Sequence, residues 1–135
     1  MEIQLSMVVL EVADLDASVA FYRRLGLDLP DPPSEGRPLV AHRMGSGVTL
    51  LLISGFASRY DPEWAPLPGR SAQLLEFYVG EDSLVDRAWH DLVAAGYHGR
   101  MPPAQTAGPY AAMVDDPDGN VILLTSDEAA SPGAP

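Results

Sequence analysis

Few side chains in this chain of 135 residues could carry out chemistry. There is no cysteine, which excludes disulfides, thiolate nucleophiles and cysteine metal sites. The three histidines, His42, His90 and His98, do not have the spacing of a metal site. No serine or threonine has a histidine and an acid in a recognisable context, so no nucleophile is marked. His90 and His98 are expected to face solvent, and only His42, in a predicted strand, could point into a binding site.

Two carboxylates and a phenol lie on predicted strands. Because alternate residues of a strand point to opposite faces, Glu11 shares a mixed face with apolar neighbours, and so do Glu76 and Tyr78. The other face of each strand is wholly apolar, and helices should cover it. Apolar walls with few polar groups are typical of small-molecule sites. The alternative, that Glu11 and Glu76 are solvated at strand edges, is equally open.

The elements that position these residues occur twice in the same order: a strand, a turn, a helix and a glycine. The first copy is a strand over 7–12, a turn with an aspartate suited to capping over 13–16, a helix over 17–25, and Gly26. The second copy is a strand over 74–79, a turn over 80–83, a helix over 84–95, and Gly96. Leu84, Ala88, Leu92 and Ala95 are expected to form the apolar stripe of the second helix.

Strands are predicted after each glycine, which indicates an α+β fold. They cover residues 39–44, 47–53, 110–114 and 121–125. The sequence Asp-Pro-Asp-Gly-Asn over 116–120 predicts a tight turn and hence a hairpin between the last two strands.

The sequence predicts a single domain over residues 1–126, with halves at about 5–53 and 72–126 and a disordered tail over 127–135. The segment 54–71 is too rich in proline for a central strand and is expected to be a linker. Its aromatic residues, Phe56, Tyr60 and Trp64, are expected to cover the core or a dimer partner, with ligand contact as the alternative.

The net charge of −11 makes nucleic acid an unlikely partner, because the protein repels phosphate. The acidity either serves solubility or attracts a cationic ligand. No basic region precedes an apolar stretch at the N-terminus, and no apolar run reaches membrane-spanning length. A cytoplasmic protein with no membrane partner is expected.

Residues 14–27, DLDASVAFYRRLGL, and residues 116–123, DPDGNVIL, resemble the two hallmark stretches of the vicinal oxygen chelate superfamily. This superfamily includes glyoxalase I, extradiol dioxygenases, fosfomycin-resistance enzymes and bleomycin-resistance binding proteins. The resemblance covers about residues 5–126. It implies tandem βαβββ modules whose sheets curl into a cup, and usually a homodimer.

In metal-dependent members, the resemblance implies a divalent ion held at four positions, mostly by His and Glu. The corresponding residues here are Met7 and Leu74 on the first strand of each half, and about Leu51 and Leu123 on the last. Three leucines and a thioether cannot hold Zn, Mg or Mn. The expectation is a metal-free, binding-protein-like branch with no cofactor.

The leading hypothesis is therefore metal-free binding or sequestration of a small molecule, such as a drug or antibiotic. No catalytic residue is assigned. The expected ligand-binding residues are Met7, Glu11, His42, Leu51, Leu74, Glu76, Tyr78, Tyr110 and Leu123. The alternative is a lyase, isomerase or dioxygenase-like enzyme in which Glu76 or Glu11 moves a proton without a metal. A metal-dependent enzyme would require a misaligned site.

Overall fold

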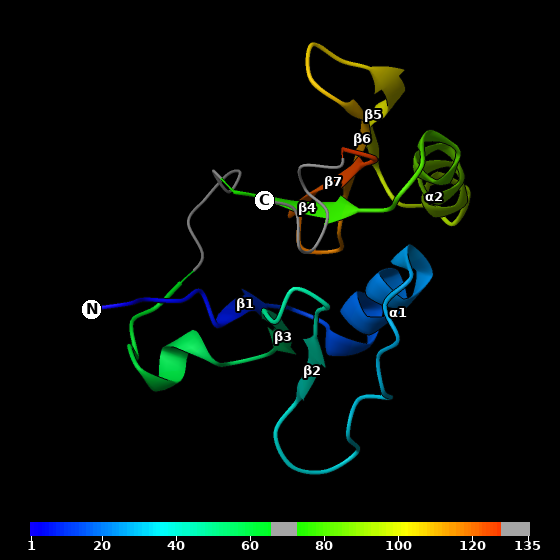
Figure 1. Ribbon diagram of the computed structural model, residues 1–135. Coiled ribbons are helices and arrows are strands. Elements are labelled where there is room, and N and C mark those ends of the chain that lie inside the picture. Colours follow the sequence, from blue (N-terminus) through cyan, green and yellow to red (C-terminus); the bar gives the residue numbers. More distant parts are fainter. Residues whose placement is uncertain (66–72, 128–135) are drawn as a thin grey trace. The chain divides into compact units, whose positions relative to one another are not determined.

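Both halves of the chain begin with a strand that is followed by a helix (Figure 1). The computed structural model describes residues 1–65 and 73–127, which belong to two compact units, one in each half of the chain. Each unit contains one α-helix and one mixed β-sheet. The α+β class and the repeated order are confirmed. The joint cup and the single domain stay predictions.

The first unit has a three-stranded sheet in the order β1-β3-β2. Its elements are β1 (Met7–Glu11), α1 (Leu15–Leu25), β2 (Leu39–Arg43), β3 (Thr49–Ile53) and the short 3₁₀ helix η1 (Ala57–Arg59). Strand β1 is parallel to β3, and β2 is antiparallel to it. This is one strand fewer than a βαβββ module, because residues 27–38, with four prolines, form no strand.

Helix α1 has clear signals at both ends. The side chain of Asp14 accepts a hydrogen bond from the backbone N–H of Ala17 at 3.1 Å, so the helix begins at Leu15, two residues earlier than predicted. At the other end, Gly26 has a φ of 128° and donates its N–H to the carbonyls of Tyr22 and Arg23. The predicted glycine stop is confirmed.

The strand register assigns each residue of the first sheet to one of two faces. One face carries Leu10, Val40 and Leu52, which are aligned across the three strands and buried. Helix α1 contacts β3 and is the one α-helix of this unit's described residues that can cover this face. We call the opposite face, which includes the exposed Met7 and Arg43, the helix-free face of the first sheet.

The second unit has a four-stranded sheet in the order β4-β7-β6-β5. Its elements are β4 (Leu74–Tyr78), α2 (Asp82–Ala94), β5 (Gly99–Gln105), β6 (Tyr110–Asp115) and β7 (Val121–Thr125). Strand β4 is parallel to β7, and the other neighbours are antiparallel. Helix α2 packs against β5, β6 and β7, as Figure 1 shows.

Strand β5 is absent from the sequence-based prediction because its centre contains Pro102 and Pro103. Proline cannot donate to a strand ladder and is confined to edge strands and bulges. Strand β5 satisfies both conditions, since it is the edge of its sheet and its register shifts on each side of Met101. Its partner β6 was predicted and is confirmed.

The buried stripe of α2 differs from the expected one. Val85 and Leu92 are fully buried, whereas Ala95 is exposed. Trp89 extends the contact, because its indole N–H donates to the carbonyl of Met113 at 3.0 Å. A Cβ atom on Gly99 would lie 2.6 Å from the Trp89 ring, so the sheet face that includes Gly99 is the one that α2 covers. The opposite face is the helix-free face of the second sheet.

The turn between β6 and β7 confirms the predicted hairpin. The carboxylate of the buried Asp116 accepts hydrogen bonds from the backbone N–H groups of Asp118 at 3.0 Å and Asn120 at 2.8 Å. Gly119 adopts the positive φ of 86° that the turn requires.

The predicted linker and tail are only partly described. Residues 54–65 include η1 and a ring contact between Phe56 and Tyr60, with centroids 5.2 Å apart, while residues 66–71 lie outside the described part. Tyr60 and Trp64 are exposed in their unit. Of the predicted tail, residues 128–135 also lie outside it. None of the helices in the described ranges has the length and apolar character needed to cross a membrane.

Candidate functional site

Most of the expected ligand-binding residues lie on the helix-free faces. In the first sheet, Leu51 pairs with Val9 and shares the face of Met7. In the second sheet, Glu76 pairs with Leu123, and the alternation along β4 puts Leu74 and Tyr78 on the same face. Within each unit, therefore, the register brings the expected pair of first-strand and last-strand residues onto one face.

His42 lies on the other face of the first sheet. It pairs with Leu50, which in turn pairs with Val8. Leu50 and Val8 each lie two residues before a buried leucine, Leu52 and Leu10, and therefore on the same face as these leucines. Hence His42 shares the helix-covered face, and the expectation that it points toward a site on the opposite face is wrong. The strand itself was predicted, but the face of its residues depends on the register with β3.

Tyr110 is also directed toward the helix in its unit. It lies two and four residues before Ala112 and Val114 on β6, and so shares their face. Both of these residues are fully buried on the face that α2 covers. Its hydroxyl donates a hydrogen bond to the carboxylate of Asp86 on α2. This hydrogen bond, followed by burial and the negative charges of Asp86 and Asp82, raises the pKa of Tyr110 above its usual value. Tyr110 therefore holds the helix on the sheet and is not placed on the helix-free face.

Glu11 lies on the predicted side of β1, but its carboxylate is engaged. It accepts hydrogen bonds from the backbone N–H of Gly55 at 3.1 Å and from that of Ala57. These donors precede and begin η1, where backbone N–H groups have no partner within the helix. Glu11 thus ties the end of β1 to the start of the linker, and a ligand would have to compete with two backbone donors for it.

Glu76 and Tyr78 differ from the other polar candidates. Both belong to β4 and point to the helix-free face of the second sheet. In residues 1–65 and 73–127, neither side chain makes a hydrogen bond or an ion pair, and Glu76 is exposed. Their polar atoms are therefore available to a ligand without loss of an existing contact.

Two methionines that were not expected complete this face. Met113 of β6 pairs with Leu123, and Met101 of β5 pairs with Met113. Met113 could have been found from the alternation of its predicted strand, which puts it on the side opposite Ala112. Met101 could not, because its strand was hidden by the adjacent prolines.

An ion pair lies at the edge of the same face. Asp115 lies two residues after Met113 on β6 and therefore on the same face. Its carboxylate accepts two hydrogen bonds from the Arg100 guanidinium, and the one from Nε is 2.7 Å long. The hydrogen bonds to Asp115 raise the pKa of Arg100 above its ordinary value. Arg100 was not predicted either, because it also belongs to β5. Its charge is matched by Asp115.

The residues at the four positions where the resemblance implies a metal ion do not fit one. Met7 and Leu51 in one sheet, and Leu74 and Leu123 in the other, offer three hydrocarbon side chains and one thioether. Divalent ions such as Zn²⁺, Mg²⁺ and Mn²⁺ need nitrogen, oxygen or thiolate donors. Across the described part of the chain, no three His, Asp or Glu side chains form another group that could hold such an ion.

Comparison with known proteins agrees with this fold. The sequence of residues 4–124 matches the profile of the Glyoxalase/Bleomycin resistance protein/Dioxygenase superfamily. No curated protein sequence shows a significant match. A hypothetical protein from S. aureus is 23% identical, with a TM-score of 0.77 and coverage of 94% of this chain and 95% of that one.

Two further structures illustrate the range of similar proteins. A glyoxalase-related enzyme from Fulvimarina pelagi is 26% identical, with a TM-score of 0.72 and coverage of 90% and 86% of the two chains. The fosfomycin resistance protein FosX from Listeria monocytogenes is 17% identical, with a TM-score of 0.68 and coverage of 93% and 92%, which shows a shared fold alone. The chain belongs to the Glyoxalase/Bleomycin resistance protein/Dioxygenase superfamily.

Proposed function

We propose that this protein binds or sequesters a small organic molecule, such as a drug or antibiotic, against the helix-free faces of its sheets, without a metal ion. The observation that carries the proposal is the apolar character of Met7, Leu51, Leu74 and Leu123, where the resemblance implies metal ligands, together with their place on one helix-free face within each unit. Such a surface retains the apolar contacts of a small-molecule site, and these four residues offer no donor set for a divalent metal ion.

The contrast with a relative supports this proposal. A variant of the Listeria fosfomycin resistance protein forms a complex with Mn(II) and 1S,2S-dihydroxypropylphosphonic acid. A hard ion needs oxygen or nitrogen ligands, and a small polar anion needs cationic groups or hydrogen-bond donors. The helix-free faces described above offer mainly aliphatic and thioether groups, which favour a larger and less polar ligand.

The first test is the metal content of the purified protein, measured by elemental analysis, followed by thermal-shift screens with divalent metals and with a library of small molecules. We expect no stoichiometric metal and no stabilisation by metals, but stabilisation by a library member, because a ligand at about 100 times its Kd stabilises by about 2.7 kcal/mol. One tightly bound Zn, Ni, Mn or Fe per chain would contradict the proposal.

A variant with restored donors provides the positive control. Replacing Leu74 by His and Leu123 by Glu supplies, on one face of the second sheet, donor types that the superfamily resemblance implies for these positions. We expect this double variant to gain thermal stabilisation by Mn(II) or Zn(II) that the wild type lacks. If it gains none, these two residues do not occupy ligand positions, and the argument for a metal-free protein fails.

A second candidate function is metal-free catalysis, with Glu76 as the base. The observation in its favour is the carboxylate of Glu76, which lies beside Leu123 on a largely apolar face and has no partner among the described residues. Glu11 is less suited, because its carboxylate already accepts hydrogen bonds from two backbone N–H groups. The variant Glu76→Gln separates the two functions: loss of turnover with binding retained would favour the enzyme.

A further inference from the structure

A continuous row of side chains crosses the helix-free face of the second sheet. In register, Met101 of β5 pairs with Met113 of β6, Met113 with Leu123 of β7, and Leu123 with Glu76 of β4. We call these four residues the methionine row. Neighbouring strands are about 4.8 Å apart, so the row is about 14 Å long, and its apolar part from Met101 to Leu123 is about 10 Å long, close to the length of three fused aromatic rings.

The apolar part of this row suits a flat aromatic group. Met101 and Met113 are half-buried, so part of each thioether side chain remains accessible. Methionine side chains adapt to irregular shapes and make favourable sulfur contacts with aromatic rings, and they are over-represented on promiscuous binding surfaces. Leu123 between them and Glu76 is also half-buried and extends the apolar floor.

The polar end of the row carries negative charge. Glu76 has no ion-pair partner in the described ranges, and Tyr78 lies two residues further along the same face of β4, where its ring can accept a cation. The chain has no lysine, and in the described part of the second unit Arg87 lies on α2 and Arg100 is already paired with Asp115. The whole protein carries a charge of −11, which favours the approach of cations.

We propose that the methionine row, together with Tyr78, recognises a planar aromatic cation: the ring system lies over Met101, Met113 and Leu123, and the positive charge is directed toward Glu76. This inference rests on the proposed binding function and specifies its ligand class. It predicts that anionic ligands bind this face poorly, because no unpaired cation of the described second unit lies on it.

The test compares three probes that share one ring system: 10-methylacridinium, neutral acridine and acridine-9-carboxylate. Their binding to the full-length protein is followed by fluorescence titration in mildly alkaline buffer, where acridine is uncharged. We expect the cation to bind about tenfold more tightly than acridine, from the combined ion-pair and cation-π contributions. The carboxylate is expected to bind more weakly than either.

Two pairs of variants assign the effect to the row. Glu76→Gln should weaken binding of the cation about fivefold and leave acridine unchanged, whereas the control Glu35→Gln, in the exposed loop before β2, should change neither. Met113→Ala should weaken both probes about tenfold, and Met113→Leu should keep affinity within about threefold, because it retains the apolar volume. Thermal melts identify any variant that fails to fold, and Met113→Leu then carries the comparison.

Any one of four results would overturn the inference. These are equal binding of the cation and acridine, preference for the carboxylate, an unchanged affinity of Glu76→Gln for the cation, and binding of none of the three probes. These results would leave the proposed metal-free binding function standing, because that function is judged separately by metal content and by the small-molecule screen.

Discussion

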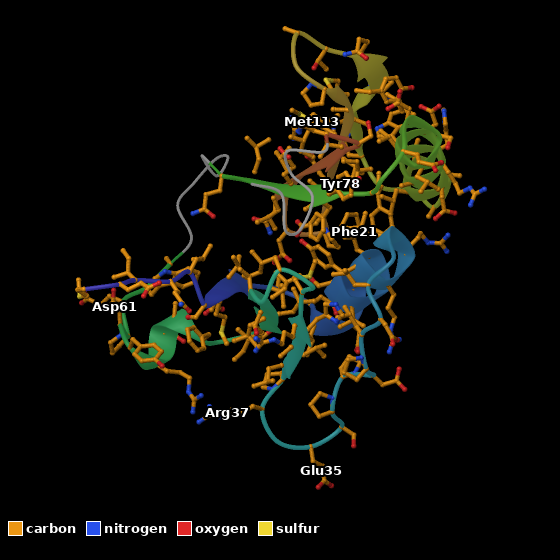
Figure 2. The ribbon with its side chains drawn as sticks, viewed as in Figure 1. Phe21, Glu35, Arg37, Asp61, Tyr78 and Met113 are labelled. Atoms are coloured by element: carbon orange, nitrogen blue, oxygen red, sulfur yellow. The ribbon has the colours of Figure 1, made fainter. Side chains whose placement is uncertain are left out.

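Hydrogen bonding separates the polar residues of this protein into those that hold the structure together and those that remain available. The carboxylate of Glu11 caps η1, the hydroxyl of Tyr110 binds Asp86, and Arg100 is paired with Asp115. Glu76 and Tyr78 are the polar candidates on a helix-free face without such partners in the described residues. Figure 2 shows Tyr78 and Met113 on the sheet of the second unit.

The hydrogen bond between Tyr110 and Asp86 predicts a late-titrating tyrosine. Its pKa is raised in the folded protein, so the unfolded chain loses this proton first as the pH rises. Stability from this group is therefore complete below about pH 10, the unfolded value, and declines as the pH rises through the folded pKa. In a spectrophotometric titration, Tyr110→Phe should remove one phenolate that appears above the ordinary tyrosine range.

The control for this prediction is Tyr60→Phe, which removes an exposed tyrosine. It should leave unchanged the phenolates that appear above the ordinary range. If Tyr110→Phe also removes none of them, the hydrogen bond to Asp86 does not perturb Tyr110 in solution.

At the scale of elements, the ends of α1 are set by local signals. The Asp14 side chain caps the backbone N–H of Ala17, and replacing it by alanine leaves that donor without its acceptor. Asp14→Ala should lower the free energy of unfolding by about 1 kcal/mol in urea denaturation. Asp14→Asn, which keeps the acceptor oxygen, should lose much less. Equal losses in both variants would show that the cap contributes through its charge instead.

The packing of α2 on its sheet depends on the absence of a side chain at Gly99. A Cβ atom there would lie 2.6 Å from Trp89 Cζ2 and 2.7 Å from Val93 Cγ2. The helix would have to shift, so Gly99→Ala should lower the free energy of unfolding by about 1 to 3 kcal/mol. The matched control is Gly45→Ala, because a Cβ atom at Gly45 meets nothing within 4 Å and its φ is not positive.

Chemical denaturation of both glycine variants measures this difference. The control should change stability by less than about 0.5 kcal/mol. A wild-type stability for Gly99→Ala would mean that α2 does not approach β5 as closely as the structure shows.

At the scale of the whole molecule, the resemblance to the superfamily predicts a homodimer. The exposed Tyr60 and Trp64, at the start of the linker between the two units, are apolar residues that a second copy could cover. Light scattering at micromolar concentration should then give twice the chain mass of 14.4 kDa. A monomeric mass would contradict this prediction. The double variant Tyr60→Ser/Trp64→Ser should shift the protein toward the monomer if the linker contributes to the contact.

The sequence by itself determined the α+β class, both helices and the hairpin between β6 and β7. These features depend on local physics: Asp14 and Gly26 bound one helix, Leu92 marks the apolar side of the other, and Asp116 and Gly119 form the turn. The apolar types at the expected metal positions are also visible in the sequence, since residue identity alone excludes them as ligands for hard divalent ions.

Only the tertiary structure decided which residues face which way. His42 was expected on the wrong face and Tyr110 proved to bind α2, because the face of a strand residue depends on register with strands distant in the chain. Strand β5 was missed because two prolines are tolerated only at an edge, and edge position is a property of the assembled sheet. The methionine row exists only where four strands align, which no local pattern specifies.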